Sequence, residues 1–312
     1  MHKDSVNWRG FIEAVVTPMR EDGSIDEEAF LLNLEQQIDE GVHGFLIVGC
    51  TGEHWALAPE EKRDLFRLAV QQVKGRVTVI CGVSANNTAD AIRLMRYAYE
   101  AGADGAMSMP PAVATPNDRE IVEYFKAITR AVDIPVLAYN IPSRQVVNMK
   151  PELVSKLADI PNVVAIKESS GDPVQIVETI RVAGDRIRVF VGYDTGALFG
   201  IAMGAYGCMS IGAQVIGRRA VELITASLEG DLATARARQF DSYLFWKHFG
   251  SPAVGSFPAW LKEAMNLLGR PGGYPRAPIL PVTDEERERI RVALRELNAT
   301  PVTPRAPATA SR

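Results

Sequence analysis

Asn162-Val163-Val164-Ala165-Ile166-Lys167-Glu168-Ser169-Ser170 is the stretch from which the rest of the chain can be interpreted. Val163 to Ile166 are apolar and mostly β-branched. A strand with one face in water would alternate with polar residues, so this run predicts a strand that is buried on both faces. Lys167 ends the run. Because a lysine is rarely buried without a partner, it either reaches out to solvent or lies at the rim of a pocket.

A lysine in apolar surroundings can act as a nucleophile. Loss of hydration lowers the pKa of the ammonium from about 10.4, sometimes by several units. The neutral amine that results can attack a carbonyl carbon and form a Schiff base. Lysines at strand ends are common, so a purely structural Lys167 is the alternative interpretation.

The composition describes an ordinary globular protein with a large core. The chain has 312 residues, 47% hydrophobic and 23% charged, which suits one α/β barrel or two smaller domains. The net charge is −4 with both signs interspersed, so we expect no nucleic acid and no membrane among its partners. Residues 1–10 lack the apolar core of a signal peptide, and no apolar run approaches the roughly 20 residues of a membrane span. This predicts a cytoplasmic protein.

The cysteines and histidines indicate neither a disulfide framework nor a metal site. Cys50, Cys81 and Cys208 are odd in number, far apart and without a C-x-x-C pattern, so we expect free thiols. The histidines have no spacing that suggests metal ligands.

Strand and helix patterns alternate about eight times along the chain. The expected strands are 11–16, 45–48, 77–81, 105–108, 135–139, 163–166, 187–191 and 207–211. The expected helices between and after them are 26–39, 59–73, 88–99, 118–131, 150–158, 173–182, 195–203 and 215–228. Such an alternation with short connections predicts an α/β fold, a (β/α)8 TIM barrel.

An open doubly wound sheet is the structural alternative. It would normally carry a glycine-rich nucleotide turn after its first strand, whereas Thr17-Pro18-Met19-Arg20 follows here. We therefore assign residues 1–228 to the barrel and 229–298 to a C-terminal helical extension with helices at 232–249, 256–268 and 284–297. Residues 299–312 are rich in Pro, Thr and Ala, which predicts a disordered tail.

Catalytic groups of such barrels lie at the carboxyl ends of the strands. The second strand is followed by Gly49-Cys50-Thr51-Gly52-Glu53, whose amides could hold a carboxylate, although an ordinary tight turn explains it as well. The fifth ends in Tyr139-Asn140-Ile141-Pro142-Ser143-Arg144, which offers a phenol for proton transfer and a guanidinium for an anion. The seventh and eighth supply Gly192 and Met209. These groups meet at one end of the barrel as a site for a carbonyl substrate that bears a carboxylate.

Three motifs resemble the dihydrodipicolinate synthase and N-acetylneuraminate lyase family of class I pyruvate-dependent lyases. They are the G-x-T-G-E turn at Gly49, the Y-N-x-P segment at Tyr139 and the I-K-E-S-S-G-D segment that contains Lys167. They occur in the family's order and spacing, and the likeness extends from about Trp8 to Leu297.

The resemblance implies a role for each of these residues. Lys167 would form a Schiff base with pyruvate or another 2-oxo acid, and Tyr139 would relay protons. The hydroxyl of Thr51, with the neighbouring Cys50 and nearby amides, would bind the carboxylate of the 2-oxo acid. The resemblance also implies a homotetramer built as a dimer of dimers, with no metal and no organic cofactor.

Two positions point to different branches of the family. Arg144 matches the synthases, in which this arginine holds the carboxylate of the aldehyde substrate. Val113, however, occupies the place of a tyrosine that completes the synthases' proton relay from a neighbouring subunit, and Cys50 stands where Thr or Ser is more usual.

The reaction that the resemblance favours is that of 4-hydroxy-tetrahydrodipicolinate synthase, which joins pyruvate to aspartate semialdehyde. The alternatives are an aldolase, dehydratase or deaminase for a 2-oxo-3-deoxy sugar acid or a cyclic imino acid. A non-catalytic protein that binds a 2-oxo acid is a more remote alternative, because a mere binder gains little from a buried amine beside a phenol.

Overall fold

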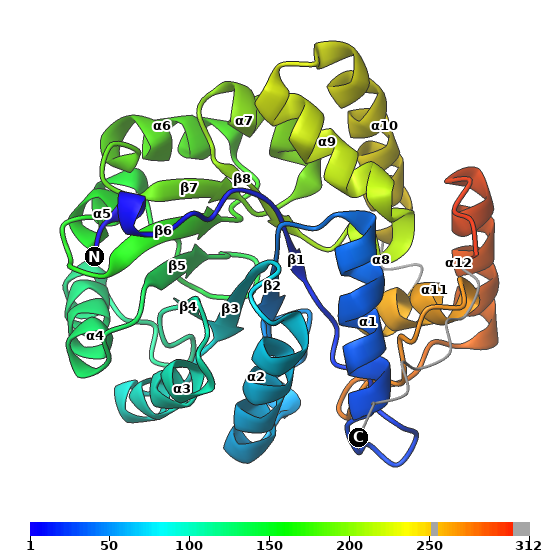
Figure 1. Ribbon diagram of the computed structural model, residues 1–312, viewed down its shortest axis with the longest axis horizontal. Helices are drawn as coiled ribbons and strands as arrows, with labels where there is room; N and C mark the ends of the chain where they lie inside the picture. The colour runs from blue at the N-terminus through cyan, green and yellow to red at the C-terminus, as the bar shows by residue number, and fades with distance from the viewer. Residues whose placement is uncertain (251–254, 302–312) are drawn as a thin grey trace.

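Eight parallel strands close into a barrel in the computed structural model, which describes residues 1–250 and 255–301 (Figure 1). The last strand pairs with the first, from Gly10 opposite Gly207 to Glu13 opposite Ser210, so no sheet edge is left open. The predicted (β/α)8 barrel with additional C-terminal helices is confirmed. The strands are β1 (Gly10–Ala14), β2 (Gly44–Ile47), β3 (Thr78–Gly82), β4 (Gly105–Ser108), β5 (Val136–Asn140), β6 (Val163–Glu168), β7 (Arg188–Val191) and β8 (Gly207–Ser210).

Helices that follow the strands form the outer layer (Figure 1). Several begin at side chains that accept a hydrogen bond from the first turn, as Asp26 does from the Ala29 amide and Asn87 from the Asp90 amide. The helices are α1 (Glu27–Glu40), α2 (Pro59–Val73), α3 (Thr88–Ala101), α4 (Asp118–Ala131), α5 (Pro151–Leu157), α6 (Pro173–Ala183), α7 (Ala197–Ala202), α8 (Ala213–Ile216) and α9 (Arg218–Glu229), with short 3-10 turns at Lys3–Ser5, His54–Ala56 and Asp194–Gly196.

The eighth helical segment differs from its prediction. We expected one helix over 215–228, whereas the structure has the short α8 and then α9, separated by Gly217. Gly217 has φ +56° and ψ −138°, a conformation that interrupts the helix and that glycine adopts more readily than other residues.

Three further helices follow the barrel, α10 (Leu232–Phe249), α11 (Ala259–Leu267) and α12 (Asp284–Glu296). Helix α10 packs against α9, and α11 contacts both α8 and α12, so the extension lies along one side of the barrel (Figure 1). The predicted disordered tail lies mostly outside the described residues, because the description ends at residue 301. None of the helices in the described ranges has the length and apolar character needed to cross a bilayer.

Strand β6 is buried along its whole length, as its sequence predicts. Successive side chains of a barrel strand point alternately inward and outward, so Lys167 and Glu168 face opposite sides of the wall. Glu168 is tied to its neighbours, because its carboxylate accepts hydrogen bonds from Asn140 at 2.9 Å, Gln175 at 3.2 Å and the Ser170 amide at 2.6 Å. This network locks β6 against β5 and α6 and thereby fixes the direction in which Lys167 points.

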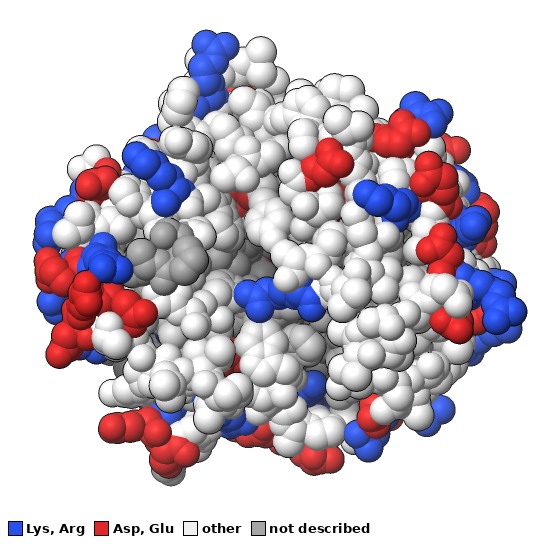
Figure 2. Space-filling model, turned by 180° about the vertical axis from the view of Figure 1, so that it is seen from behind, with Lys and Arg blue, Asp and Glu red and all other residues white. Residues whose placement is uncertain are grey.

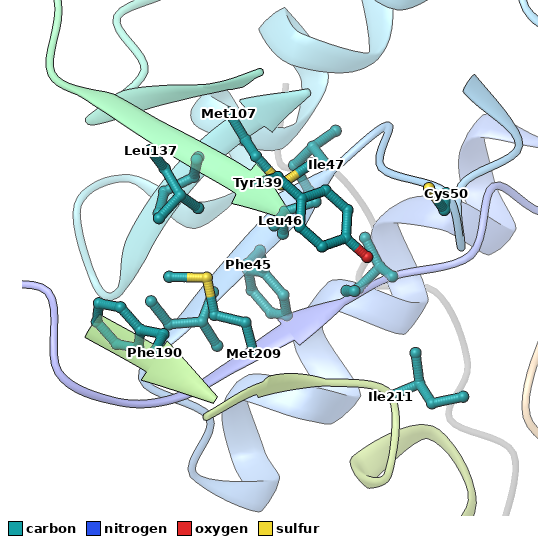
Figure 3. Close-up of a cluster of buried hydrophobic side chains, with 14 of the residues drawn as sticks. Phe45, Leu46, Ile47, Cys50, Met107, Leu137, Tyr139, Phe190, Met209 and Ile211 are labelled. Atoms are coloured by element: carbon teal, nitrogen blue, oxygen red, sulfur yellow. The ribbon is translucent and has the colours of Figure 1, made fainter. Parts of the chain in front are cut away.

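The interior of the barrel is filled by apolar side chains. Figure 3 shows Phe45, Leu137, Phe190 and Met209 packed together, each at most 1% exposed. We call this packed apolar layer the floor of the barrel. The carboxyl ends of the strands lie above it.

Figure 2 shows charged side chains of both signs along the margins of one face of the molecule. Its described residues form no continuous basic area, in keeping with the net charge of −4.

Candidate active site

Lys167 and Tyr139 are neighbours across the β5–β6 pair, where their Cα atoms stand in register. The Lys167 Nζ lies 4.6 Å from the centre of the Tyr139 ring. Both side chains are nearly inaccessible to solvent, Lys167 at 5% and Tyr139 at 4% exposure. The strand-end lysine is thus held inside the mouth of the barrel beside the phenol and does not extend into water.

A cavity of about 510 Å³ opens above these two residues. It also contacts Cys50, Thr51, Arg144 and Gly192. The structure therefore brings six of the seven predicted site residues to one cavity. The full lining of the described residues is Cys50, Thr51, Tyr139, Ile141, Ser143, Arg144, Lys167, Gly192, Tyr193, Ser210, Ile211, Trp246, Phe249, Gly250, Gly255, Phe257 and Trp260.

Met209 is the predicted site residue that the structure does not bring to this cavity. Its side chain is fully buried and lies one layer lower, against the aromatic floor near Phe190 (Figure 3). Ser210 and Ile211, the next two residues, line the cavity in its place. The sequence placed the loop correctly but not the depth of the residue within the barrel.

The amine of Lys167 has a lowered pKa. Burial is the main cause, because it disfavours the ammonium and brings the pKa below the ordinary 10.5. The nearby Cys50, Cys208, Asp194 and Glu13 oppose this shift by favouring the charged form. The net effect is a larger share of neutral, nucleophilic amine at a given pH.

The phenol of Tyr139 shows the opposite shift. Burial raises its pKa well above 10, so the hydroxyl keeps its proton at neutral pH. In Figure 3 the hydroxyl points away from the packed floor toward the side where Cys50 and Ile211 lie. A protonated phenol in this position can donate a proton to a bound substrate and recover it later.

The turn after β2 presents Thr51 to the cavity and is tightly built. A Cβ atom on Gly49 would lie 2.5 Å from Leu46 Cδ2, so a larger residue would force Leu46 to move. The Thr17 hydroxyl donates to the Gly52 carbonyl at 2.9 Å. These contacts fix the turn that brings Thr51 and Cys50 to the cavity that Lys167 also lines.

Glu53, the last residue of this turn, faces away from the cavity and forms a fully buried ion pair with Lys262 of α11. Lys262 Nζ also donates to the carbonyls of Thr17 at 2.6 Å and Tyr274 at 2.7 Å. The acidic residue of the G-x-T-G-E motif is therefore structural, since it fastens the substrate turn to the C-terminal extension.

Gly192 lets the chain pass close to β6. A Cβ atom there would lie 1.7 Å from Ser169 Oγ and 2.9 Å from the Glu168 carbonyl oxygen. The absence of a side chain at Gly192 thus lets this turn approach the neighbouring strand β6 at the edge of the cavity.

Arg144 lies at the outer rim. Its guanidinium carbon is 4.9 Å from the centre of the Phe257 ring and 5.8 Å from that of Trp55. No carboxylate of the described residues pairs with it. Val113, by contrast, lies in the loop after β4 with its side chain 80% exposed and outside the lining of the cavity.

Sequence reasoning missed the contribution of the C-terminal helices. The cavity is also lined by Trp246, Phe249, Phe257 and Trp260, whereas the sequence pattern predicted only a helical extension in this region. The aromatic run Tyr243-Leu244-Phe245-Trp246-Lys247-His248-Phe249 was the available signal. It was ambiguous, because aromatic residues on a helix more often serve the core.

Two buried carboxyl groups act electrostatically on Lys167, and sequence reasoning assigned a function to neither. Burial raises the pKa of Asp194 to about 7 and that of Glu13 well above its usual range. Glu13 Oε2 accepts the Ala213 amide at 3.1 Å. Within the described ranges no cluster of His, Cys, Asp or Glu has the make-up of a metal site.

The comparisons with known proteins agree with this geometry. Residues 7–297 match the model of the Dihydrodipicolinate synthetase family. The chain belongs to this family. A 4-hydroxy-tetrahydrodipicolinate synthase of Nitratidesulfovibrio vulgaris is 36% identical over 92% of this chain and 97% of its own length.

Solved structures of the family superpose closely on this chain. A dihydrodipicolinate synthase from Aquifex aeolicus has a TM-score of 0.89 with 34% identity, covering 95% of this chain and 100% of its own. A chloride-inhibited synthase from Acinetobacter baumannii, solved in complex with pyruvate, has a TM-score of 0.88 with 29% identity, covering 93% of this chain and 99% of its own. The chain is thus a class I, Schiff-base-forming lyase of this family, similar to the 4-hydroxy-tetrahydrodipicolinate synthases.

Proposed function

We propose that Lys167 forms a Schiff base with pyruvate and that the enzyme makes or breaks a carbon–carbon bond at the methyl carbon of pyruvate. One observation carries this proposal: a buried amine with a lowered pKa lies 4.6 Å from the ring of a buried, protonated phenol in an open cavity. The amine attacks the ketone carbon and water leaves. The protonated imine then withdraws electrons, so loss of a methyl proton gives an enamine and not a bare carbanion.

We assign the proton transfers to Tyr139. Its ring centre lies 4.6 Å from the amine, and its raised pKa keeps the hydroxyl protonated and ready to donate. Its hydroxyl protonates the hydroxyl group that leaves as water when the imine forms, and the phenolate that results takes the methyl proton, which restores the phenol. When the enamine carbon attacks an aldehyde, the developing alkoxide needs a proton, which the phenol supplies. Hydrolysis of the new imine then releases a 4-hydroxy-2-oxo acid and returns the free amine.

We assign the carboxylate of pyruvate to the turn after β2. Thr51 offers a hydroxyl and Cys50 a thiol whose pKa is raised by burial, so the thiol remains neutral and does not repel an anion. Gly192, which follows β7, also lines the cavity, and we assign its backbone to the binding of the same pyruvate molecule.

The reaction named for the similar synthases, condensation of pyruvate with aspartate semialdehyde, is the first candidate. Arg144 is positioned at the rim to take the carboxylate of that aldehyde, and no carboxylate of the described residues occupies it. The loop at Val113 does not offer a phenol for the relay. Cleavage or dehydration of a 2-oxo-3-deoxy sugar acid, or deamination of a cyclic imino acid, is the second candidate.

One assay separates these candidates. Condensation of pyruvate with aspartate semialdehyde is measured beside pyruvate release from a small panel of 2-oxo-3-deoxy acids. We expect turnover with at least one of them, and the preferred substrate identifies the reaction. Turnover of any one of them excludes a protein that only binds a 2-oxo acid.

We also propose that the chain works in the cytoplasm as a homotetramer built as a dimer of dimers. The exposed apolar side chains Trp55, Val113, Val174 and Phe199 support burial against further copies. Sedimentation velocity should give a mass four times the 34.1 kDa of the chain. A monomer at micromolar concentration would contradict the proposed assembly.

A further inference from the structure

Four aromatic side chains form one wall of the cavity that contains Lys167. Trp246 and Phe249 come from α10, Phe257 precedes α11 and Trp260 lies within it. We call these four residues the aromatic wall. Every other residue of the lining comes from the strand ends and loops of the barrel or from the glycines beside these helices.

The aromatic wall is packed as a unit. The rings of Phe249 and Trp260 stack at 4.8 Å with 18° between their planes, and Phe257 lies 5.7 Å from Trp260. Tyr193, from the barrel, meets Trp246 edge-on at 5.6 Å. Rings held by other rings keep their orientation, so the wall is a preformed apolar surface.

The side of the cavity formed by the aromatic wall offers little to a polyhydroxylated substrate. Among the described lining residues there is no Asp, Glu, Asn, Gln or His, which are the side chains best suited to bind several hydroxyl groups at once. The serine, threonine and tyrosine hydroxyls of the described lining come from the strand ends and loops of the barrel. A sugar-like chain directed at the aromatic wall would lose hydrogen bonds to water without replacing them.

Arg144 extends the same surface. A planar guanidinium stacks on aromatic faces, and that of Arg144 lies 4.9 Å from the centre of the Phe257 ring and 5.8 Å from that of Trp55. The rim therefore combines flat rings with one flat cation, both of which complement a flat ring on a ligand.

We propose that the aldehyde partner of pyruvate carries a flat, apolar, aromatic body that lies against the aromatic wall. This rests on the proposed Schiff-base function of Lys167 and names an aromatic aldehyde as its second substrate, ahead of the aspartate semialdehyde that the similar synthases suggest. In the condensation, the enamine carbon forms a bond to the aldehyde carbon, the carbonyl electron pair moves to oxygen, and Tyr139 protonates that oxygen. Water hydrolyses the imine, so one pyruvate and one aldehyde give one 4-hydroxy-2-oxo acid.

The test compares aldehydes at fixed pyruvate. Benzaldehyde, glyceraldehyde and aspartate semialdehyde are each assayed with the full chain, and kcat/KM is obtained from pyruvate consumption. We expect kcat/KM for benzaldehyde to exceed that for glyceraldehyde and for aspartate semialdehyde by about tenfold or more. Equal or better use of either of the other two overturns the inference.

Matched variants locate the effect. Phe257→Leu keeps an apolar side chain but removes the ring, and should lower kcat/KM for benzaldehyde about tenfold while that for glyceraldehyde changes little. Phe240→Leu, the same change on α10 at a side chain that is 63% exposed and outside the cavity, should leave both values unchanged. An equal loss for both aldehydes in Phe257→Leu contradicts a role in recognising the ring.

Borohydride trapping of pyruvate on Lys167 distinguishes a failure of this inference from a failure of the proposed function. If trapping succeeds and the aromatic aldehyde is not preferred, this inference alone is wrong. If Lys167 does not trap pyruvate at all, the proposed function falls with it.

Discussion

Lys167 and Tyr139 owe their reactivity to burial at adjacent strand ends. The same loss of hydration lowers the pKa of the amine and raises that of the phenol, so both groups are driven toward their neutral forms. A neutral amine can attack a ketone, and a neutral phenol can give up a proton. One environment thus prepares a nucleophile and an acid side by side.

Replacement of the phenol tests its role as a proton relay. Tyr139→Phe keeps the buried ring against Lys167 and removes only the hydroxyl. We expect kcat to fall by about 10²–10⁴ with a much smaller change in KM, because the lost interaction belongs to the proton transfer. Steady-state kinetics measure this, and a rise in KM at unchanged kcat would reduce Tyr139 to a packing residue.

Asp194 makes stability depend on pH. Its pKa is about 7 in the folded protein against 3.8 ordinarily, and burial is the main cause. A raised pKa means that its contribution to stability is full below about 4 and is lost as pH rises through about 7, a loss of up to about 4 kcal/mol. The amide of Asp194→Asn does not ionise, so this variant does not lose stability in this way as pH rises.

Thermal unfolding of both proteins between about pH 4 and about pH 8 checks this expectation. The Tm of Asp194→Asn should rise relative to the Tm of the wild type as pH increases through this range. A constant difference in Tm across it would show that the carboxyl group is already ionised in the folded protein at low pH.

Strand β6 illustrates how elements hold the site. Glu168, whose side chain points outward, fixes the end of the strand through hydrogen bonds from Asn140 and Gln175. Lys167, whose side chain points inward, can therefore serve the reaction. Asn140 therefore belongs to the Y-N-x-P motif for a structural reason, while Tyr139 beside it faces the cavity. Motif membership alone does not separate these two roles, whereas the alternation of side chains along a strand does.

The turn after β2 depends on a helix more than two hundred residues later in the chain. Lys262→Met leaves the carboxylate of Glu53 buried without its partner and should lower the free energy of unfolding by about 3–5 kcal/mol. Adding Glu53→Gln removes the orphaned charge and should restore part of that loss. Urea unfolding measures both, and equal stability of Lys262→Met and the double variant would contradict a cost from the buried, unpaired carboxylate.

In the molecule as a whole, the barrel was predictable because each βα unit carries a local signal. Apolar runs mark the strands, and helical spacing with caps such as Asp26 and Asn87 marks the helices. The rule that barrel enzymes use the carboxyl ends of their strands then selected Lys167, Tyr139 and Thr51. Depth within the barrel carries no such local signal, which is why Met209 was chosen in place of Ser210 and Ile211.

The aromatic wall could not be predicted in the same way. Its residues lie after the eighth βα unit, and an aromatic helix face looks the same in sequence whether it covers a core or a substrate. The position of α10 and α11 beside the cavity follows from contacts between segments far apart in sequence, such as the pair of Glu53 with Lys262. Only the folded chain shows that these helices complete the site.

The whole account depends on the amine of Lys167 being neutral and within reach of pyruvate. The most direct measurement is reduction with borohydride in the presence of pyruvate, followed by mass spectrometry of the peptide that contains Lys167. The account predicts a carboxyethyl group on the Lys167 nitrogen that forms only when pyruvate and borohydride are both present. A Lys167 peptide that stays unmodified under saturating pyruvate would contradict it.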